Sequence, residues 1–262
     1  QIARLYLARN RYISNPASSF FFCWQDGLHE WLEDWQPEAL IIEANPRYRT
    51  IPVAVKWMHA RGWPVIGWGL GAPQPRGLLG ALRTLGWPRF LQQFDALIAY
   101  SQRGAEQYHS RGFPSERIFV APNAVAPRPK EPPPPRPPEF QGRLMVLFVG
   151  RLQTRKRLDH LLRACAALPL ELQPRLVVVG DGPERASLEN LAQTIYPQTE
   201  FPGARSRPAL APYFAAADLF VLPGTGGLAV QEAMSYGLPV VVARGDGTQD
   251  DLVRPSNGWQ IP

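Results

Sequence analysis

The chain has 262 residues, of which 45% are hydrophobic and 19% are charged, a composition that excludes a disordered or fibrous protein. No apolar run approaches the ~20 residues of a membrane-spanning helix, and no basic start leads into an apolar segment, so the sequence predicts neither a spanning protein nor a signal peptide. Cys23 and Cys165 stand far apart and fit no metal-ligand or redox spacing. A cytoplasmic protein is the simplest interpretation.

The net charge of +6 is unevenly distributed along the chain. Up to Gln141 there are sixteen Lys and Arg against eleven Asp and Glu, whereas from Gly142 onward there are twelve against eleven. The basic excess favours contact with an anionic lipid or an anionic acceptor, and the alternative is a solvated surface rich in arginine. Because no DNA- or RNA-binding signature accompanies the charge, nucleic acid is not expected as a partner.

The first part of the chain alternates helical and strand patterns. Apolar residues recur at helical spacing over 27–35, 51–60 and 77–94, with a break expected near Pro88. Short apolar runs predict buried strands at 39–42, 64–68, 95–100 and 118–120. Ser101 is expected to cap the helix that follows the third of these strands.

A proline-rich segment then divides the chain. Residues 127–138 read PRPKEPPPPRPP, which predicts a rigid, polar spacer. Proline-rich segments also bind partner modules, but a position between two α/β patterns favours the spacer. We therefore expect a first domain over 1–126, a linker over 127–141 and a second domain over 142–262.

The second part repeats the alternation more clearly. Strands are predicted at 144–149, 175–179, near 201, 219–222 and 239–243, and helices at 158–167, 184–193, 210–217 and 228–236. Apolar strands that alternate with helices predict two parallel-sheet, Rossmann-like domains of the α/β class facing a cleft. Because ligands bind beyond the carboxyl ends of such strands, the residues that follow each strand are the candidates for chemistry.

The loop after the strand at 144–149 is the most basic in the chain. It begins with Gly150, which permits close backbone approach to a ligand, and continues through Arg151 to Lys156. Arginine offers a planar fork for phosphate oxygens and lysine a compact charge, so this loop is a candidate phosphate site. An exposed loop with solvated charges is the alternative.

Two glycine-containing turns follow other strands of the second part. Gly180 opens a Gly-Asp-Gly-Pro sequence that a tight turn before a helix explains by itself. Residues 223–228 read PGTGGL and open the helix that carries Glu232. Backbone amides at a helix start favour a diphosphate, and a carboxylate one turn later can accept hydrogen bonds from a sugar diol. The alternative for Glu232 is a charge that is favourable to the helix dipole.

At this point the second half resembles the nucleotide-binding domain of GT-B glycosyltransferases of family 4. The matching segments are FVGRLQTRK (148–156), VVVGDGPE (177–184), AAADLFVLPG (215–224), GLAVQEAMSYGLPVV (227–241) and NGWQI (257–261). The first half resembles the acceptor domain of the same family more loosely, through FDALIAYSQRGAEQY (94–108) and RIFVAPNAV (117–125).

The resemblance implies a retaining hexosyltransferase that moves a sugar from a nucleotide-diphosphate sugar to a glycan or lipid-linked acceptor, without a metal or other cofactor. By this resemblance Arg151 and Lys156 hold the diphosphate and stabilise the leaving group. The other donor-side candidates are Gly150, Gly180, Arg205 near the base, Gly224, the backbone at Gly226, Gly227 and Leu228, and Glu232 on the ribose.

The chain departs from the family pattern in four places. Many members of the family carry two glutamates eight residues apart in this segment. Gly224 stands at the place of the first glutamate, and Glu232 is the second. The place of a catalytic histidine reads Trp68-Gly69-Leu70. The first strand of the family would precede Gln1, and the final helices would follow Pro262. The sequence therefore predicts a fragment that lacks both ends.

On the acceptor side, Glu43, Asn45, Arg47 and Gly69 follow predicted strands and are candidates, although ordinary loop turns explain each of them as well. The amphipathic stretch 78–94, which carries Arg83, Arg89 and several aromatic residues, is interpreted as a core helix. Its alternative is a peripheral contact with an anionic membrane at the cytoplasmic face.

Two other functions remain open from the sequence. The missing carboxylate and histidine favour a non-catalytic protein that binds a nucleotide sugar or a partner. A GT-B-fold sugar-nucleotide epimerase shares the architecture, but the segments 148–156 and 227–241 match family 4 better. Neither the donor sugar and base nor the acceptor follows from the residues.

Overall fold

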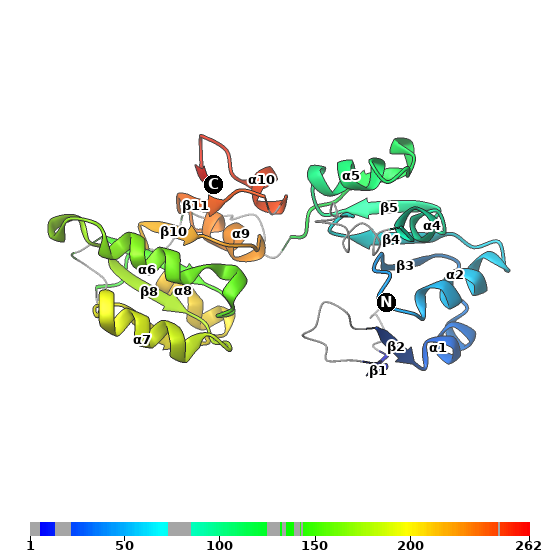
Figure 1. The fold of residues 1–262 in the computed structure, drawn as a ribbon, viewed down its shortest axis with the longest axis horizontal. Helices are drawn as coiled ribbons and strands as arrows, with labels where there is room; N and C mark the ends of the chain where they lie inside the picture. Colours follow the sequence, from blue (N-terminus) through cyan, green and yellow to red (C-terminus); the bar gives the residue numbers. More distant parts are fainter. Residues whose placement is uncertain are drawn as a thin grey trace. The chain divides into compact units, whose positions relative to one another are not determined.

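A computed structural model describes residues 6–13, 22–72, 85–124, 132, 135–138, 142, 144–245 and 247–262. The chain forms two compact units, unit 1 from Gln1 to Pro122 and unit 2 from Asn123 to Pro262 (Figure 1). Each unit alternates strands and helices, which confirms the predicted α/β class. The predicted bounds of the domains and of the linker stay predictions, and each unit is described by itself.

Unit 1 contains a four-stranded parallel sheet in the order β3-β4-β5-β6 and a separate antiparallel pair, β1 and β2. Its elements are β1 (Arg9–Tyr12), β2 (Cys23–Asp26), α1 (Leu28–Trp35), β3 (Leu40–Glu43), α2 (Ile51–His59), β4 (Val65–Gly69), α4 (Trp87–Leu91), β5 (Ala96–Ala99), α5 (Gln102–His109), the 3-10 helix η1 (Ser115–Arg117) and β6 (Ile118–Val120).

Most predicted elements of unit 1 are confirmed to within two residues, including the cap of α5. The Ser101 side chain accepts a hydrogen bond from the Gly104 amide at 3.0 Å. The structure agrees with the break expected near Pro88, because α4 begins only at Trp87 and Pro88 lies in its first turn, where its missing N–H costs nothing. Residues 73–84 of the predicted helical stretch lie outside the described residues.

The sequence did not predict the pair β1 and β2. All four residues of β1 are exposed, so the alternation of apolar and polar residues that signals a half-buried strand is missing. The pair is joined to the rest of unit 1 through the loop after β3. The Cys23 amide donates to the Arg47 carbonyl, and the Arg49 amide donates to the Cys23 carbonyl, both at 2.9 Å.

Asp95, just before β5, links α2 to β4. Its Oδ2 atom accepts from the Val65 amide at 2.7 Å and lies 3.0 Å from His59 Nε2. Burial alone would raise the pKa of Asp95, but the Val65 hydrogen bond and His59 outweigh it and hold the pKa below its usual value.

This lowered pKa predicts a pH-dependent contribution to stability. A carboxyl with a depressed folded-state pKa stabilises the fold above its unfolded pKa, about 3.9, and this stability is lost as pH falls through the folded pKa. We expect Asp95→Asn to lower the free energy of unfolding by about 1 kcal/mol at neutral pH, since the side chain is half exposed. In urea titrations this difference should shrink below pH ~4. Asp34→Asn, at an exposed position, should show neither effect.

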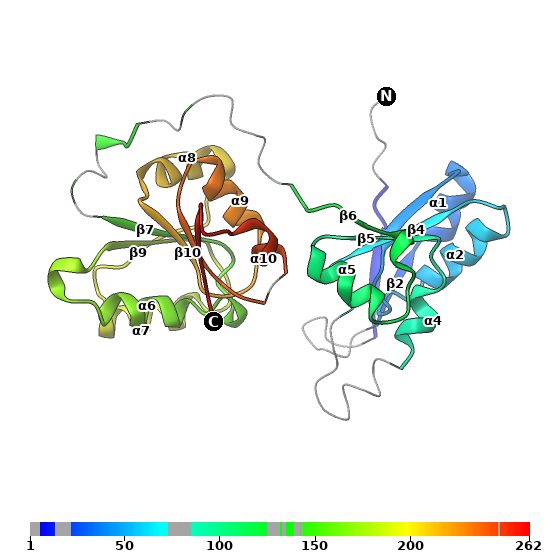
Figure 2. The same cartoon turned by 90° about the horizontal axis from the view of Figure 1, so that it is seen from above.

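Unit 2 is a six-stranded parallel sheet with helices on both faces. Figure 2 shows α6 and α7 on one face and α8 and α9 on the other. Its elements are β7 (Met145–Val149), the 3-10 helix η3 (Thr154–Lys156), α6 (Leu158–Ala166), the 3-10 helix η4 (Leu170–Leu172), β8 (Arg175–Val179), α7 (Arg185–Ile195), β9 (Glu200–Gly203), α8 (Arg207–Ala216), β10 (Leu219–Leu222), α9 (Leu228–Ser235), β11 (Val240–Ala243), α10 (Thr248–Leu252) and β12 (Gly258–Ile261).

The strand order of unit 2 is β12-β11-β10-β7-β8-β9. Numbered from β7 as the first strand, this is the doubly wound order 3-2-1-4-5-6 of dinucleotide-binding folds. The central strands β7 and β8 are almost entirely buried, as the apolar runs predicted. The helix α8 begins three residues earlier than expected, because Pro208 suits a first helical turn. The elements α10 and β12 were not predicted.

The described part of the proline-rich segment is attached to unit 2. The Arg136 guanidinium binds the Asp218 carboxylate with both of its terminal nitrogens, at 3.3 and 2.7 Å. The same carboxylate accepts from the Met145 amide at 2.7 Å, just where β7 begins. Asp218 therefore ties residues 135–138 to the first strand of the sheet.

Candidate functional site

The carboxyl ends of β7 and β10 lie side by side in the unit 2 sheet, and the chain leaves these two strands in opposite directions. At such a switch point an α/β sheet opens a crevice in which ligands bind. The loop after β7 carries Gly150, Arg151 and η3, and the loop after β10, residues 223–227, carries three glycines and leads into α9. The topology thus brings together two motifs that the sequence identified separately.

Hydrogen bonds join these two loops directly. The Thr225 amide donates to the Arg155 carbonyl at 3.2 Å, and Arg155 Nη1 donates to Thr225 Oγ1 at 3.4 Å. Lys156 Nζ donates to the Thr225 carbonyl. The ammonium group of Lys156 is therefore fixed at the glycine-rich loop that precedes α9, half-buried, whereas Arg151 is exposed.

Gly224 and Gly226 permit this close approach of the two loops. A Cβ atom on Gly224 would lie 2.6 Å from Lys156 Cα, and one on Gly226 would meet Lys156 Nζ. Gly226 also has a φ of +138°, which residues with side chains rarely adopt. The glutamate expected from the resemblance at Gly224 does not fit this loop conformation, because its Cβ would overlap the backbone of Arg155 and Lys156.

The sequence suggested that the amides at the start of α9 are free, but at least one of them is bound within the protein. The Gly226 amide donates to Gln249 Oε1 at 3.0 Å, and Gln249 is completely buried. A Cβ on Gly227 would lie 2.5 Å from Thr248 Cγ2, so Gly227 packs against the same helix, α10. Sequence reasoning missed Gln249 because α10 has only five residues and no apolar periodicity.

Gly150 and Gly180 lie against each other at the ends of neighbouring strands. Gly180 has a φ of +150°, and a Cβ on it would overlap the Gly150 carbonyl. The Leu152 amide donates to the Asp181 carbonyl at 2.9 Å, so the turn after β8 supports the loop after β7. Packing thus accounts for Gly180, and its contact with a donor stays a prediction.

Glu232 lies in the second turn of α9, and its side chain is 18% exposed. Its carboxylate is 4.0 Å from Arg207 Nε at the start of α8. Arg205 is exposed two residues earlier, in the loop after β9. The structure therefore places Arg205, Glu232 and the start of α9, with Leu228, along the carboxyl edge of one sheet, and their contact with a donor stays a prediction.

The acceptor-side candidates lie on two loops of unit 1. Asn45 Nδ2 donates to Glu43 Oε1 at 3.0 Å, and Asn45 Oδ1 accepts from the Arg47 amide at 3.2 Å. Asn45 therefore shapes the turn after β3, and Glu43 is the exposed carboxylate of that turn. Gly69 is buried, and a Cβ atom there would lie 2.8 Å from the Tyr108 hydroxyl. Burial raises the pKa of Tyr108 to about 12, so this hydroxyl stays neutral.

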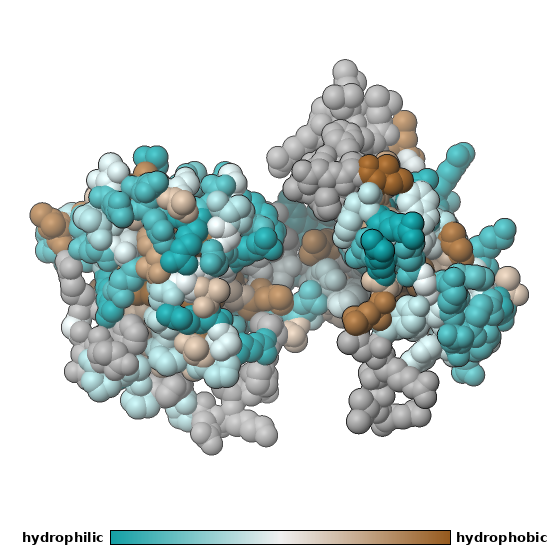
Figure 3. Space-filling view, turned by 90° about the horizontal axis from the view of Figure 1, so that it is seen from below, coloured by the Kyte–Doolittle hydropathy of each residue, from teal (hydrophilic) through white to brown (hydrophobic). Residues whose placement is uncertain are grey.

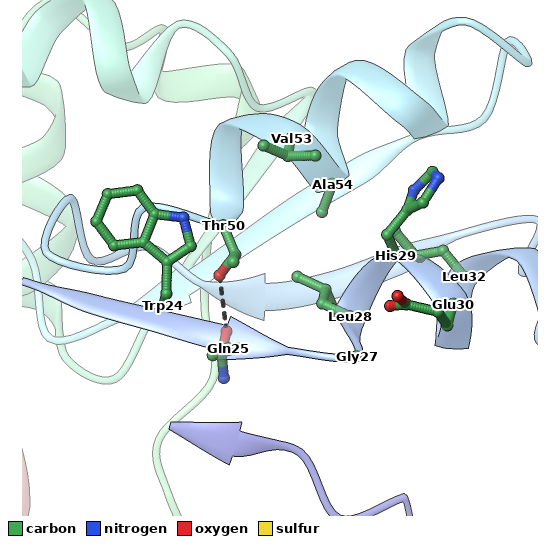
Figure 4. A pocket seen from close by; sticks show the side chains of 10 residues that line it. All are labelled: Trp24, Gln25, Gly27, Leu28, His29, Glu30, Leu32, Thr50, Val53 and Ala54. Carbon is green, nitrogen blue, oxygen red and sulfur yellow. Dashed lines mark hydrogen bonds between the residues drawn. The ribbon is translucent and has the colours of Figure 1, made fainter. Parts of the chain in front are cut away.

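A pocket of about 230 Å³ lies in unit 1 between β2, the start of α1 and the start of α2 (Figure 4). Apolar side chains form much of its wall, and Thr50 Oγ1 donates to Gln25 Oε1 at 3.2 Å across one end. Its lining consists of Trp24, Gln25, Gly27, Leu28, His29, Glu30, Leu32, Thr50, Val53 and Ala54. This pocket was not predicted from the sequence, because one of its walls is β2, a strand that was not predicted either.

The stretch 78–94, for which a membrane contact was the alternative interpretation, is described by the structure from residue 85 onward. Phe90 and Leu91 are buried in the core of unit 1, and Trp87 packs against that core, as a core helix requires. Arg83 lies outside the described residues.

None of the helices described here is long and apolar enough to cross a membrane. Within the described ranges, no cluster of His, Cys, Asp and Glu is arranged to hold a metal ion.

A doubly wound parallel sheet, with a lysine and glycine-rich loops at its switch point, defines the class of this domain as a Rossmann-like α/β protein. Residues 130–262, just over half of the chain, match the family described as glycosyl transferases group 1. Residues 8–124 match the glycosyl transferase 4-like domain. The chain therefore belongs to the group 1 glycosyl transferases and has the GT-B fold that its solved relatives share.

Three known proteins illustrate the similarity. The GDP-mannose-dependent alpha-mannosyltransferase of Mycolicibacterium smegmatis is 41% identical over 117 residues, which are 44% of this chain and 29% of the relative. The lipopolysaccharide outer core galactosyltransferase WaaB, in its apo form, has a TM-score of 0.68 and 22% identity, over 88% of this chain and 64% of that chain. Anabaena Alr3699/HepE, in complex with UDP and glucose, has a TM-score of 0.61 and 19% identity, over 89% and 66%. The chain thus spans less than two thirds of each.

Proposed function

We propose that this chain is the donor- and acceptor-binding part of a retaining glycosyltransferase. It transfers a hexose from a nucleotide-diphosphate sugar to a glycan or lipid-linked acceptor, in the cytoplasm and without a metal. The observation that carries the proposal is the position of Lys156, whose ammonium group is tied to the Thr225 carbonyl at the glycine-rich entrance to α9. A positively charged side chain and the N-terminus of a helix therefore lie together at the carboxyl edge of the unit 2 sheet.

The chemistry follows from the charge that develops during transfer. When the bond between the sugar and the diphosphate breaks, negative charge builds up on the leaving phosphate, and fixed cations at that place lower the barrier. Lys156 supplies such a cation, Arg151 a second one from the exposed side, and the dipole of α9 acts at Gly227 and Leu228. Because these groups neutralise the diphosphate, the mechanism needs no metal. Glu232 binds the ribose and Arg205 lies near the base.

The donor nucleotide can be identified by thermal unfolding in the presence of UDP, GDP and ADP. The names of the relatives contain both GDP-mannose and UDP. A ligand that binds only the folded protein stabilises it by ~2.7 kcal/mol at a hundredfold excess over its Kd. We expect one of the three nucleotides to raise the unfolding temperature. The same rise should occur in the control variant Arg163→Ala, which removes an exposed arginine from the last turn of α6. The absence of a shift with all three would contradict the proposal.

A second candidate function is nucleotide-sugar binding without transfer. It is favoured by the steric exclusion of a carboxylate at Gly224 and by the absence of a histidine in Trp68-Gly69-Leu70. The two functions differ in one measurement. Release of nucleoside diphosphate that depends on an added acceptor supports the transferase, whereas binding of the nucleotide sugar with no such turnover supports the second function.

A further inference from the structure

Gln249 is a polar residue at a place where its residue type is rare. Glutamine side chains mostly lie at protein surfaces, and Figure 3 shows hydrophilic residues in teal over much of the visible surface of unit 2. Gln249, in the short helix α10, is completely buried. A buried side-chain amide costs free energy unless its donor and its acceptor are both bonded, so its partners identify what it holds in place.

Both ends of the Gln249 side-chain amide have partners. Its Oε1 atom accepts from the Gly226 amide at 3.0 Å, and its Nε2 atom donates to the Ala243 carbonyl at 3.4 Å. The opposite orientation of the side-chain amide would set donor against donor and acceptor against acceptor. Gln249 therefore joins the end of β11 to the glycine-rich loop that precedes α9.

Contacts outside the glycine-rich loop fix the position of Gln249. The carboxylate of the next residue, Asp250, accepts from the amides of Gly245 and Gly247 at 3.1 and 3.2 Å and thereby caps α10. On β12, Gln260 Nε2 donates to the Asp250 carbonyl at 3.2 Å. Because α10 is held from β12 and from its own start, Gln249 is an anchor for the loop after β10.

The peptide unit between Thr225 and Gly226 is held at both of its polar ends. Its N–H donates to Gln249, and its carbonyl accepts from Lys156 Nζ. The preceding peptide unit is held separately, since the Thr225 amide donates to the Arg155 carbonyl at 3.2 Å. Gly226 has a φ of +138° and no side chain, so few steric barriers oppose rotation of the peptide unit before it. The hydrogen bond to Gln249 therefore fixes the direction in which the Thr225 carbonyl points.

We propose that Gln249 is a positioning residue for Lys156. It keeps the Thr225 carbonyl turned toward the Lys156 ammonium group, which has three donors and can bind a phosphate while it keeps this bond. Without Gln249, the peptide unit can rotate and present its N–H to Lys156, and a donor that faces an ammonium group repels it. Gln249 thus acts on the reaction through Lys156, and the inference rests on the proposed function.

The experiment is a double-mutant cycle on the full-length enzyme, measured as release of nucleoside diphosphate with saturating acceptor. Gln249→Leu nearly keeps the size of the side chain and removes both of its hydrogen bonds. We expect it to lower turnover about tenfold to a hundredfold, because a displacement of about 1 Å can cost a catalytic group that much. Since Gln249 acts through Lys156, the same substitution in the Lys156→Ala background should lower turnover little further.

Two further variants separate positioning from stability. Val253→Ala removes buried methyl groups where α10 ends and is the matched control, expected to lower the thermal unfolding midpoint but not turnover. In Gln249→Glu the carboxyl group still accepts from the Gly226 amide, but when ionised it cannot donate to the Ala243 carbonyl. We therefore expect Gln249→Glu to lose stability and yet to keep more turnover than Gln249→Leu.

Three outcomes overturn the proposal. They are normal turnover in Gln249→Leu, equal losses of turnover in Gln249→Leu and Val253→Ala, and losses that simply add in the double variant of Lys156 and Gln249. If Gln249→Leu does not fold, Gln249→Glu decides, because turnover as low as in Lys156→Ala would also contradict positioning through the Gly226 amide. Failure of the proposed function is distinguishable, since turnover would then be unchanged already in Lys156→Ala.

Discussion

Replacing Lys156 by alanine should lower the turnover of the full-length enzyme by about 10²–10³-fold, which corresponds to roughly 3–4 kcal/mol of lost transition-state stabilisation. The reason is the position of the ammonium group, which the Thr225 carbonyl holds at the start of α9. Charge on the leaving diphosphate would develop beside it. Folding should change little, because Lys156 is only half-buried and its loss creates no cavity in the core.

The measurement is steady-state release of nucleoside diphosphate with saturating acceptor, together with the thermal unfolding midpoint. The matched control is Arg163→Ala, which removes one positive charge from the exposed end of α6. A general electrostatic effect would lower the turnover of both variants equally. A local role of Lys156 would lower the turnover of Lys156→Ala alone. Unchanged turnover in Lys156→Ala would remove the basis of the proposed mechanism.

The parts of the fold that the sequence predicted are those with a strong local signal. The strands β7 and β8 are continuous apolar runs because both of their faces are buried, and this pattern is visible without any tertiary information. The exposed strand β1, with the sequence RNRY, has no such pattern. Its partner β2 has only four residues, too few for a periodicity to be recognised.

Spacing alone predicted the candidate site as separate motifs and the family resemblance grouped them, but the contacts that join them were not predicted. That Lys156 reaches the Thr225 carbonyl depends on the pairing of β7 with β10, two strands that are about 70 positions apart in the chain. The buried Gln249, which accepts from the Gly226 amide, has no sequence signature because its partner lies on another loop. Likewise, the packing of Gly180 on Gly150 depends on neighbouring strands.

The second large effect is expected from Gly224→Ala. A Cβ atom there would lie 2.6 Å from both Lys156 Cα and the Lys156 carbonyl carbon, and main-chain atoms cannot rotate away as a flexible side chain can. The two loops must therefore separate. Overpacking of this kind typically costs 1–3 kcal/mol of folding stability. Since the separation also breaks the contact of Lys156 with Thr225, turnover should fall about as far as in Lys156→Ala.

Two comparisons decide the prediction for Gly224. Gly86→Ala is the control, because a Cβ at Gly86 meets nothing within 4 Å and its φ of −80° suits any residue. Urea unfolding should show a loss for Gly224→Ala and none for Gly86→Ala. Gly224→Glu introduces the carboxylate that the family resemblance implies at this position, and on steric grounds it should be at least as damaging as alanine. A Gly224→Glu variant with wild-type stability and higher turnover would mean that the loop opens to accept the side chain, and the close approach to η3 would then not constrain this position.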